Sequence, residues 1–99
     1  MKRTVAAAAV LLVLPAAHAA DLEAGKARVT AVCAACHGAN GEGKAPNPAL
    51  AGKSEAELVQ AMNDYKSGKR TNAIMKTLAG PLSDQDVANL AAYYASLKK

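Results

Sequence analysis

The segment Cys33-Ala34-Ala35-Cys36-His37 decides how this chain is interpreted. On a helix, side chains at positions i and i+3 lie on the same face, so both thiols can reach one flat ligand. His37 follows the second cysteine directly and can place an imidazole nitrogen at the centre of that ligand. The two alanines are small and let the ligand lie against the backbone. The motif therefore predicts covalent attachment of a planar group that carries a metal.

The C-x-x-C-H spacing is the attachment pattern of c-type haem, and three rival interpretations are weaker. A disulfide between Cys33 and Cys36 would close a loop too small to add much stability. A thioredoxin-like redox motif needs a preceding strand and a βαβ unit, neither of which the sequence predicts. A zinc site needs four ligands, whereas residues 20–99 offer two cysteines and one histidine. We therefore predict one haem c with its iron, attached at Cys33 and Cys36 and ligated by His37.

The first 19 residues have the layout of a cleaved secretory signal peptide. Lys2 and Arg3 begin it, and an apolar run of ten residues follows from Val5 to Leu14. Ala17-His18-Ala19 is a small-x-small cleavage site. Because the run is too short to span a bilayer, we expect residues 20–99 to form one domain without a membrane span after cleavage.

Charge and apolar content limit the function of the mature chain. Loss of Lys2 and Arg3 lowers the formal net charge from +4 to +2. The remaining charges are spread evenly and no aromatics are interleaved with them, so no nucleic-acid or anionic-membrane partner is predicted. Residues 20–99 contain only 17 large apolar side chains (Val, Leu, Ile, Met and Tyr) among many alanines. A domain of this size usually needs additional apolar bulk, which the bound group would supply.

The periodicity predicts an all-α fold with three main helices. The first begins near Asp21, a suitable N-cap, and continues into the cysteine segment. The second begins with a capping box at Ser54 and ends at Gly68. The third begins with a similar box at Ser83 and ends in Lys98-Lys99. The apolar stripes of the three helices are Leu22, Val29 and Val32; Leu58, Met62 and Tyr65; and Val87, Leu90, Ala91, Tyr94 and Leu97.

Two long irregular segments separate these helices. Residues 38–53 are rich in Gly, Asn and Pro, and residues 67–82 are mixed, with a turn or two of helix expected at 73–78. Loops of this length are unusual in a small helical domain. We expect each of them to cover one face of the ligand.

His37 leaves the sixth coordination position of the iron to another ligand. Because residues 20–99 contain no second histidine, the candidates are Met62, Met75, a lysine or no protein ligand. Met62 lies on the apolar stripe of the second helix, where a methionine is usually core. Met75 lies in an irregular segment from which a thioether can reach the opposite face, so its position favours it.

With these residues in place, the chain resembles the class I c-type cytochromes, in particular the small bacterial monohaem proteins of the c-four and c-five groups. The similarity covers residues 20–99. It rests on Gly25, CAACHG at 33–38, PALAG at 48–52, Met75 and PLSDQDVANLAAYY at 81–94. The resemblance implies the cytochrome c fold, with three main helices and loops wrapped around one covalently bound haem.

The resemblance also assigns roles to individual residues. It implies that Met75 is the axial ligand opposite His37, and that the carbonyl of Pro48 accepts the ring N–H of His37, which would fix the imidazole tautomer. It places the contact of the first and last helices at Gly25 and Val29, against Leu90 and Tyr93 or Tyr94. Many relatives have an aromatic residue where this chain has Val29, so looser packing is expected there.

The resemblance implies a periplasmic one-electron carrier and not an enzyme, because His and Met together leave no open position on the iron. Expected partners are redox proteins such as a cytochrome bc complex, a terminal oxidase, a peroxidase or a periplasmic dehydrogenase, met by a monomer or weak dimer. Candidate docking residues are Lys26, Lys44, Lys53 and Lys76. The alternatives are a five-coordinate gas-binding or peroxidase-like haem protein with Met75 unbound, and a helical interaction module with an incidental motif.

Overall fold

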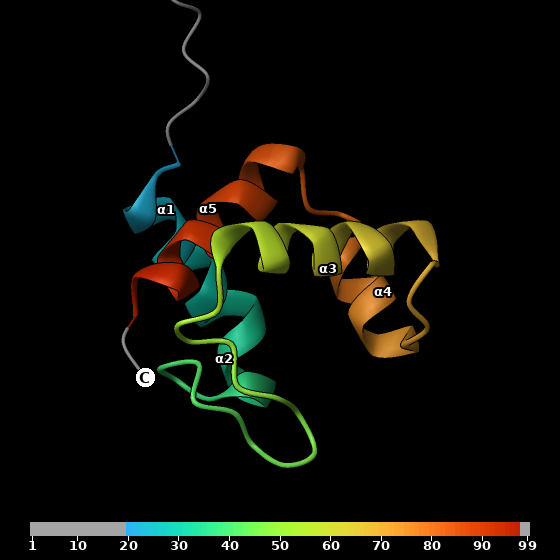
Figure 1. Ribbon diagram of the computed structural model, residues 1–99, viewed down its shortest axis with the longest axis horizontal. Coiled ribbons are helices and arrows are strands. Elements are labelled where there is room, and N and C mark those ends of the chain that lie inside the picture. The colour runs from blue at the N-terminus through green and yellow to red at the C-terminus, as the bar shows by residue number, and fades with distance from the viewer. Residues whose placement is uncertain (1–19, 98–99) are drawn as a thin grey trace, which may run out of the picture.

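A computed structural model describes residues 20–97, so the expected signal peptide at 1–19 and the terminal Lys98-Lys99 lie outside the described residues (Figure 1). The elements are α1 (Leu22–Arg28), the π-helix η1 (Val29–Cys33), α2 (Ala34–His37), α3 (Glu55–Ser67), α4 (Ala73–Ala79) and α5 (Asp84–Ser96). The all-α prediction is confirmed, since the described part contains only one isolated bridge, between Lys44 and Asn47. No helix between residues 20 and 97 is long and apolar enough to cross a membrane.

The segment predicted as one helix from Asp21 into the cysteines contains a change of register. Asp21 is the N-cap of α1, and its Oδ1 accepts the N–H of Ala24 at 3.0 Å. The chain then continues through η1 into α2 without leaving the helical region. A π turn inserts one extra residue into a helix, and such turns often occur at functional sites. Here the π turn ends at Cys33, the first cysteine of the motif.

The two predicted capping boxes differ. At α5 the box is complete, because the Ser83 side chain accepts the Asp86 N–H at 3.0 Å and the Asp86 carboxylate accepts the Ser83 N–H at 3.1 Å. That backbone bond, with Arg28 nearby, holds the pKa of the Asp86 carboxyl below its usual value. At α3 only half of the box forms: Ser54 accepts the Glu57 N–H, but the Glu57 carboxylate accepts from the Ser54 hydroxyl and not from its backbone.

Helix α1 crosses α5 at Gly25, as the resemblance implied. A Cβ at Gly25 would lie 2.2 Å from the carbonyl oxygen of Asn89, so only glycine permits this close approach. The backbone of Asn89 lies nearest, and Cβ of Tyr93 lies 3.1 Å from the same position, so Tyr93 takes part in the contact as expected. The Asn89 side chain fixes the crossing further, because its Oδ1 accepts the Asp21 N–H at 2.9 Å and the Gln85 amide at 2.8 Å. Val29, where looser packing was expected, is 1% exposed and belongs to the same buried core as Leu90.

The remaining elements surround one side of this helix pair. Figure 1 shows α3 passing in front of α5, with α4 beside the end of α3 and the loop of residues 38–53 below them. The short helix expected at 73–78 is α4, and it extends to Ala79. The loop is tied to the helices by backbone bonds from the Gly43 N–H to the His37 carbonyl (2.7 Å) and from the Gly52 N–H to the Tyr94 carbonyl (3.0 Å). These contacts place the loop against one wall of a central cavity.

Candidate cofactor site

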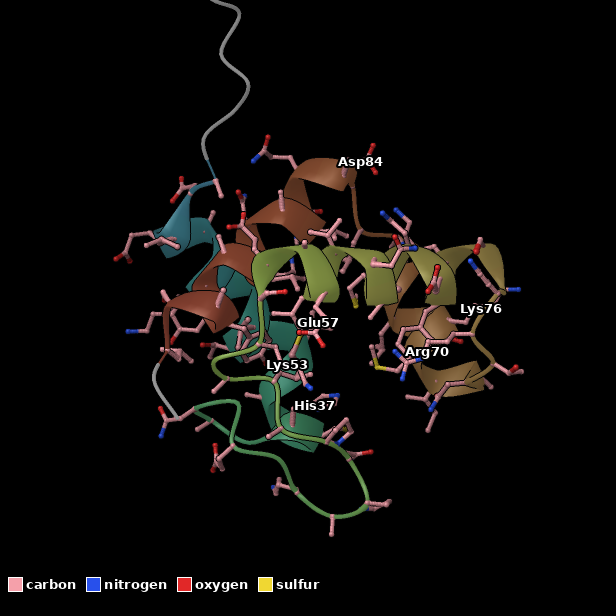
Figure 2. The ribbon with its side chains drawn as sticks, viewed as in Figure 1. His37, Lys53, Glu57, Arg70, Lys76 and Asp84 are labelled. Carbon is pink, nitrogen blue, oxygen red and sulfur yellow. The ribbon has the colours of Figure 1, made fainter. Side chains whose placement is uncertain are left out.

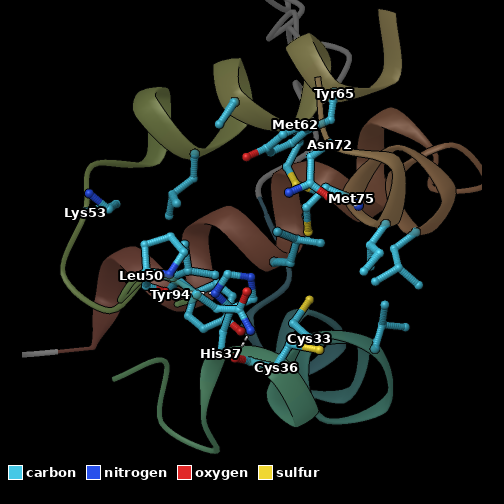
Figure 3. Close-up of a pocket in the computed structure, with 18 of the residues that line it drawn as sticks. Cys33, Cys36, His37, Leu50, Lys53, Met62, Tyr65, Asn72, Met75 and Tyr94 are labelled. Carbon is cyan, nitrogen blue, oxygen red and sulfur yellow. Dashed lines mark hydrogen bonds between the residues drawn. The ribbon is translucent and has the colours of Figure 1, made fainter. Parts of the chain in front are cut away.

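A cavity of about 360 Å³ lies between η1, α2, α3, α4, α5 and the loop of residues 38–53. Figure 3 shows the motif residues on one side of it and two methionines on the other. Most of the wall is apolar and includes Val32, Leu50, Leu58, Leu78, Leu82 and Leu90. The elements that form the walls come from both halves of the chain, so the whole fold is needed to build the site.

His37 forms part of the lower wall in Figure 3 and is only 8% exposed. Its Nδ1 lies 2.8 Å from the carbonyl oxygen of Pro48, within hydrogen-bond distance. A carbonyl cannot donate, so Nδ1 carries the hydrogen and Nε2 keeps its lone pair. An imidazole held in this way is oriented as a metal ligand through its other nitrogen.

Cys33 and Cys36 both line the cavity and both are free thiols. Cys33 is half-buried, and burial raises the pKa of its thiol above the usual value. Cys36 is exposed at the cavity edge. The loop holds the backbone of this turn, because the Asn47 side-chain amide donates to the Cys36 carbonyl at 3.0 Å. The structure therefore presents two sulfurs and one imidazole along a single helical turn.

Met62 and Met75 lie on the wall opposite His37 (Figure 3). Met62 is buried in the core, as its place on the stripe of α3 predicted, and it also lines the cavity. Met75 is half-buried in the first turn of α4. The side chain of Asn72 caps this helix and accepts the Met75 N–H at 3.0 Å. Asn72 was not among the predicted caps, although an asparagine directly before AIMKTLA is a recognisable N-cap.

Polar side chains stand at the mouth of the cavity. Figure 2 shows Lys53, Glu57 and Arg70 around the space above His37. The Arg70 guanidinium lies 4.8 Å from the centre of the Tyr65 ring, which holds it in a cation–π contact. Of the other candidate docking residues, Lys44 donates to the Ala35 carbonyl at 3.4 Å and so caps the end of the motif helix.

The imidazole, thioether and thiol groups around the cavity suit a flat group that itself supplies most of the ligands of a metal ion. Residues 20–97 contain no cluster of three or more His, Cys, Asp or Glu side chains able to hold a bare metal ion. One imidazole nitrogen and one thioether on facing walls can instead supply two axial ligands to a metal whose other ligands lie in a plane. Two thiols at the edge can attach that plane, and Lys53 and Arg70 can meet carboxylates on it.

Comparisons with known proteins show what this chain is similar to. A family model described as cytochrome c matches residues 22–98. The chain is 56% identical over 84 residues to cytochrome c4 of Pseudomonas aeruginosa, covering 83% of this chain and 41% of that protein. It is 42% identical over 82 residues to cytochrome c-554(548) of Halomonas halodenitrificans, covering 79% of this chain and 98% of that protein. The crystal structure of reduced recombinant cytochrome c4 from Pseudomonas stutzeri aligns with a TM-score of 0.73 and 40% identity, covering 81% of this chain and 47% of that one. The chain thus spans less than half the length of these cytochrome c4 relatives.

Proposed function

This chain belongs to the cytochrome c family and its cofactor is haem c, and from that premise we propose that it is a one-electron carrier whose iron is held between His37 and Met75. When bound, haem c supplies an iron that gains and loses one electron. Attachment takes place at Cys33 and Cys36, within a mature domain of residues 20–99. The observation that carries the proposal is the facing placement of the His37 imidazole and the Met75 thioether across one apolar cavity.

The residues of this chain set the redox behaviour of the site. Pro48 orients the imidazole of His37, and Asn72 holds the backbone that carries Met75. A neutral thioether ligand and an apolar surrounding both favour the ferrous state, in which the site carries less charge, and so raise the reduction potential. The same two residues ligate the iron in both oxidation states, which keeps reorganisation small. These properties suit a carrier better than a catalyst.

Residues 1–19, which lie outside the described range, bear on where in the cell the protein works. The signal-like layout of residues 1–19, with its basic start and Ala17-His18-Ala19 site, supports export. We propose that the mature domain works in the periplasm, where it exchanges electrons with respiratory or other redox proteins.

The absorption spectrum of the periplasmically expressed holoprotein tests the ligation. We expect a sulfur-to-iron band in the red region of the oxidised spectrum and no rapid binding of carbon monoxide after reduction. A missing band together with rapid carbon monoxide binding would instead assign the protein to the five-coordinate, gas-binding class.

Docking of partners is proposed at the segment that contains Met75. Residues 65–83 carry four basic side chains, Lys66, Lys69, Arg70 and Lys76, and no acidic one. Figure 2 shows Arg70 and Lys76 on the α4 side of the molecule and Asp84 at the start of α5, away from it. Ile74 lies within the segment and is 67% exposed beside the cavity. An apolar spot among cations fits an acidic redox partner that forms a small, short-lived contact.

Small charged oxidants and reductants can test this local charge without a known partner. Ferricyanide should oxidise the reduced holoprotein at a rate that falls as ionic strength rises, because salt screens its attraction to the segment. Hexaammineruthenium, a trication, should show the opposite dependence. Lys76→Gln should weaken the ferricyanide dependence, whereas Lys26→Gln on α1 should not. A ferricyanide rate that does not respond to salt would contradict the docking assignment.

A further inference from the structure

Tyr94 has a buried hydroxyl that the fold itself does not satisfy. The side chain is 0% exposed and lies in α5, facing the cavity. Its hydroxyl oxygen is the one buried side-chain polar atom in residues 20–97 without a hydrogen-bond partner. Burial of a hydroxyl without a partner destabilises a protein, so such a group in a native fold calls for an explanation.

The surrounding backbone holds this ring in place. Gly41 adopts φ +69°, and a Cβ at that position would lie 2.6 Å from Cε1 of Tyr94. The Tyr94 carbonyl also accepts the Gly52 N–H at 3.0 Å, so the loop is fixed against the same residue. Because loop and helix enclose the ring, the hydroxyl cannot turn out to water. It needs an acceptor inside the cavity.

The candidate acceptor is the sulfur of Cys33. Both residues line the cavity, and Cys33 packs against the core cluster that contains Tyr94. The two groups influence each other: burial raises the pKa of each, and the Tyr94 hydroxyl partly offsets this rise at the Cys33 thiol. Tyr93, the neighbouring tyrosine, does not line the cavity, and its ring lies 6.0 Å from that of Tyr94.

We propose that Tyr94 is a positioning residue whose hydroxyl donates a hydrogen bond to the sulfur of Cys33 once that sulfur carries the haem. This inference rests on the proposed attachment at Cys33. A thioether sulfur has no hydrogen of its own and can only accept, so the direction of the bond is fixed. The bond holds one attachment atom in place. It also turns the positive end of the O–H dipole toward the haem edge, which favours the reduced state.

Tyr94→Phe removes the hydroxyl and keeps the ring, and Tyr93→Phe is the matched control. Both are made in the holoprotein, and the midpoint potential and the thermal midpoint are measured. We expect Tyr94→Phe to lower both quantities and to leave the red sulfur–iron band unchanged, while Tyr93→Phe leaves the potential unchanged. If Tyr94→Phe instead raises the thermal midpoint without moving the potential, the hydroxyl has no partner in the holoprotein and the proposal is wrong.

Two further measurements identify the acceptor. In a Cys33→Ala background, where attachment relies on Cys36, Tyr94→Phe should no longer change the potential; a full effect in that background would place the acceptor elsewhere. If that background takes up no haem, proton NMR of the reduced holoprotein decides. A slowly exchanging Tyr94 hydroxyl proton with a nuclear Overhauser contact to the Cys33 β-protons is expected, and its absence would overturn the assignment. The red band of the unmodified holoprotein tests the proposed ligation separately, so the two failures are distinguishable.

Discussion

Replacing Cys33 and Cys36 together with alanine is expected to leave a chain without cooperative tertiary structure. The two substitutions abolish attachment, and the walls must then enclose a cavity of about 360 Å³ without the group that fills it. Because the cavity is partly open to solvent, its apolar walls then face water, and burial on which so small a domain depends is lost. A domain of this length has a net stability of only about 4–12 kcal/mol. Loss of this burial is therefore expected to remove a large part of the free energy of unfolding.

Circular dichroism with thermal melting measures this outcome. The double variant should lose most of its helical signal and melt without a sigmoidal transition. Ala31→Ser with Ala39→Ser is a suitable control, because both alanines are exposed and lie on either side of the motif. That control should keep the haem and melt as the unmodified protein does. A double cysteine variant that is native-like and melts cooperatively would show that the side chains alone suffice for the core.

Local signals in the sequence were sufficient to predict most of the helices. Asp21, Ser54 and Ser83 each stand at a helix start, and each accepts a backbone N–H as a capping residue should. Gly68 closes α3 in the left-handed region with φ +86°. Such signals depend on atoms within one turn, so they can be recognised before the tertiary fold is known. The sequence predicted that the last helix ends in Lys98-Lys99. In the structure α5 ends at Ser96, and Leu97 is already extended.

Other features depend on contacts between distant segments and could not be predicted in the same way. The π turn at Val29–Cys33 leaves no mark in the apolar spacing, since Val29 and Val32 fit an ordinary helical repeat equally well. The Tyr94 hydroxyl is buried without a hydrogen-bond partner because the loop at Gly41 packs over the tyrosine ring. The sequence predicts Tyr94 only as an apolar-face residue. Its polar atom becomes informative when the cavity around it is known.

The contact between His37 and Pro48 could be predicted, but only from the family resemblance and not from a local signal. The residues are 11 positions apart, and no periodicity links them. Family resemblance pointed to this pair, and the structure places the two atoms 2.8 Å apart. The choice between Met62 and Met75 is of a different kind, because both sulfurs line the cavity. Helix position explains why Met62 belongs to the core, and substitution of each methionine in turn distinguishes their roles.

Replacing Met75 with alanine is expected to open the sixth coordination position of the iron. The oxidised holoprotein should lose its red sulfur–iron band, and the reduced form should bind carbon monoxide rapidly. The reduction potential should fall on the order of 0.1 V, a modest part of the about 0.8 V that axial ligands span. Met75→His should restore a low-spin spectrum without the red band, because an imidazole then replaces the thioether. Absorption spectra and a redox titration measure all of these changes.

Met62→Leu is the control for this assignment, because it removes the other sulfur in the cavity at nearly constant volume. A volume-conserving change of this kind usually costs less than about 1.5 kcal/mol, so the variant should fold and take up haem. Its spectrum should be almost the same as that of the unmodified protein, since Met62 contributes packing from α3 and not a bond to iron. If Met62→Leu abolishes the red band and Met75→Ala keeps it, then α3 supplies the ligand. In that case Asn72 would position only the wall of the cavity, and the basis of the proposed site at α4 would be lost.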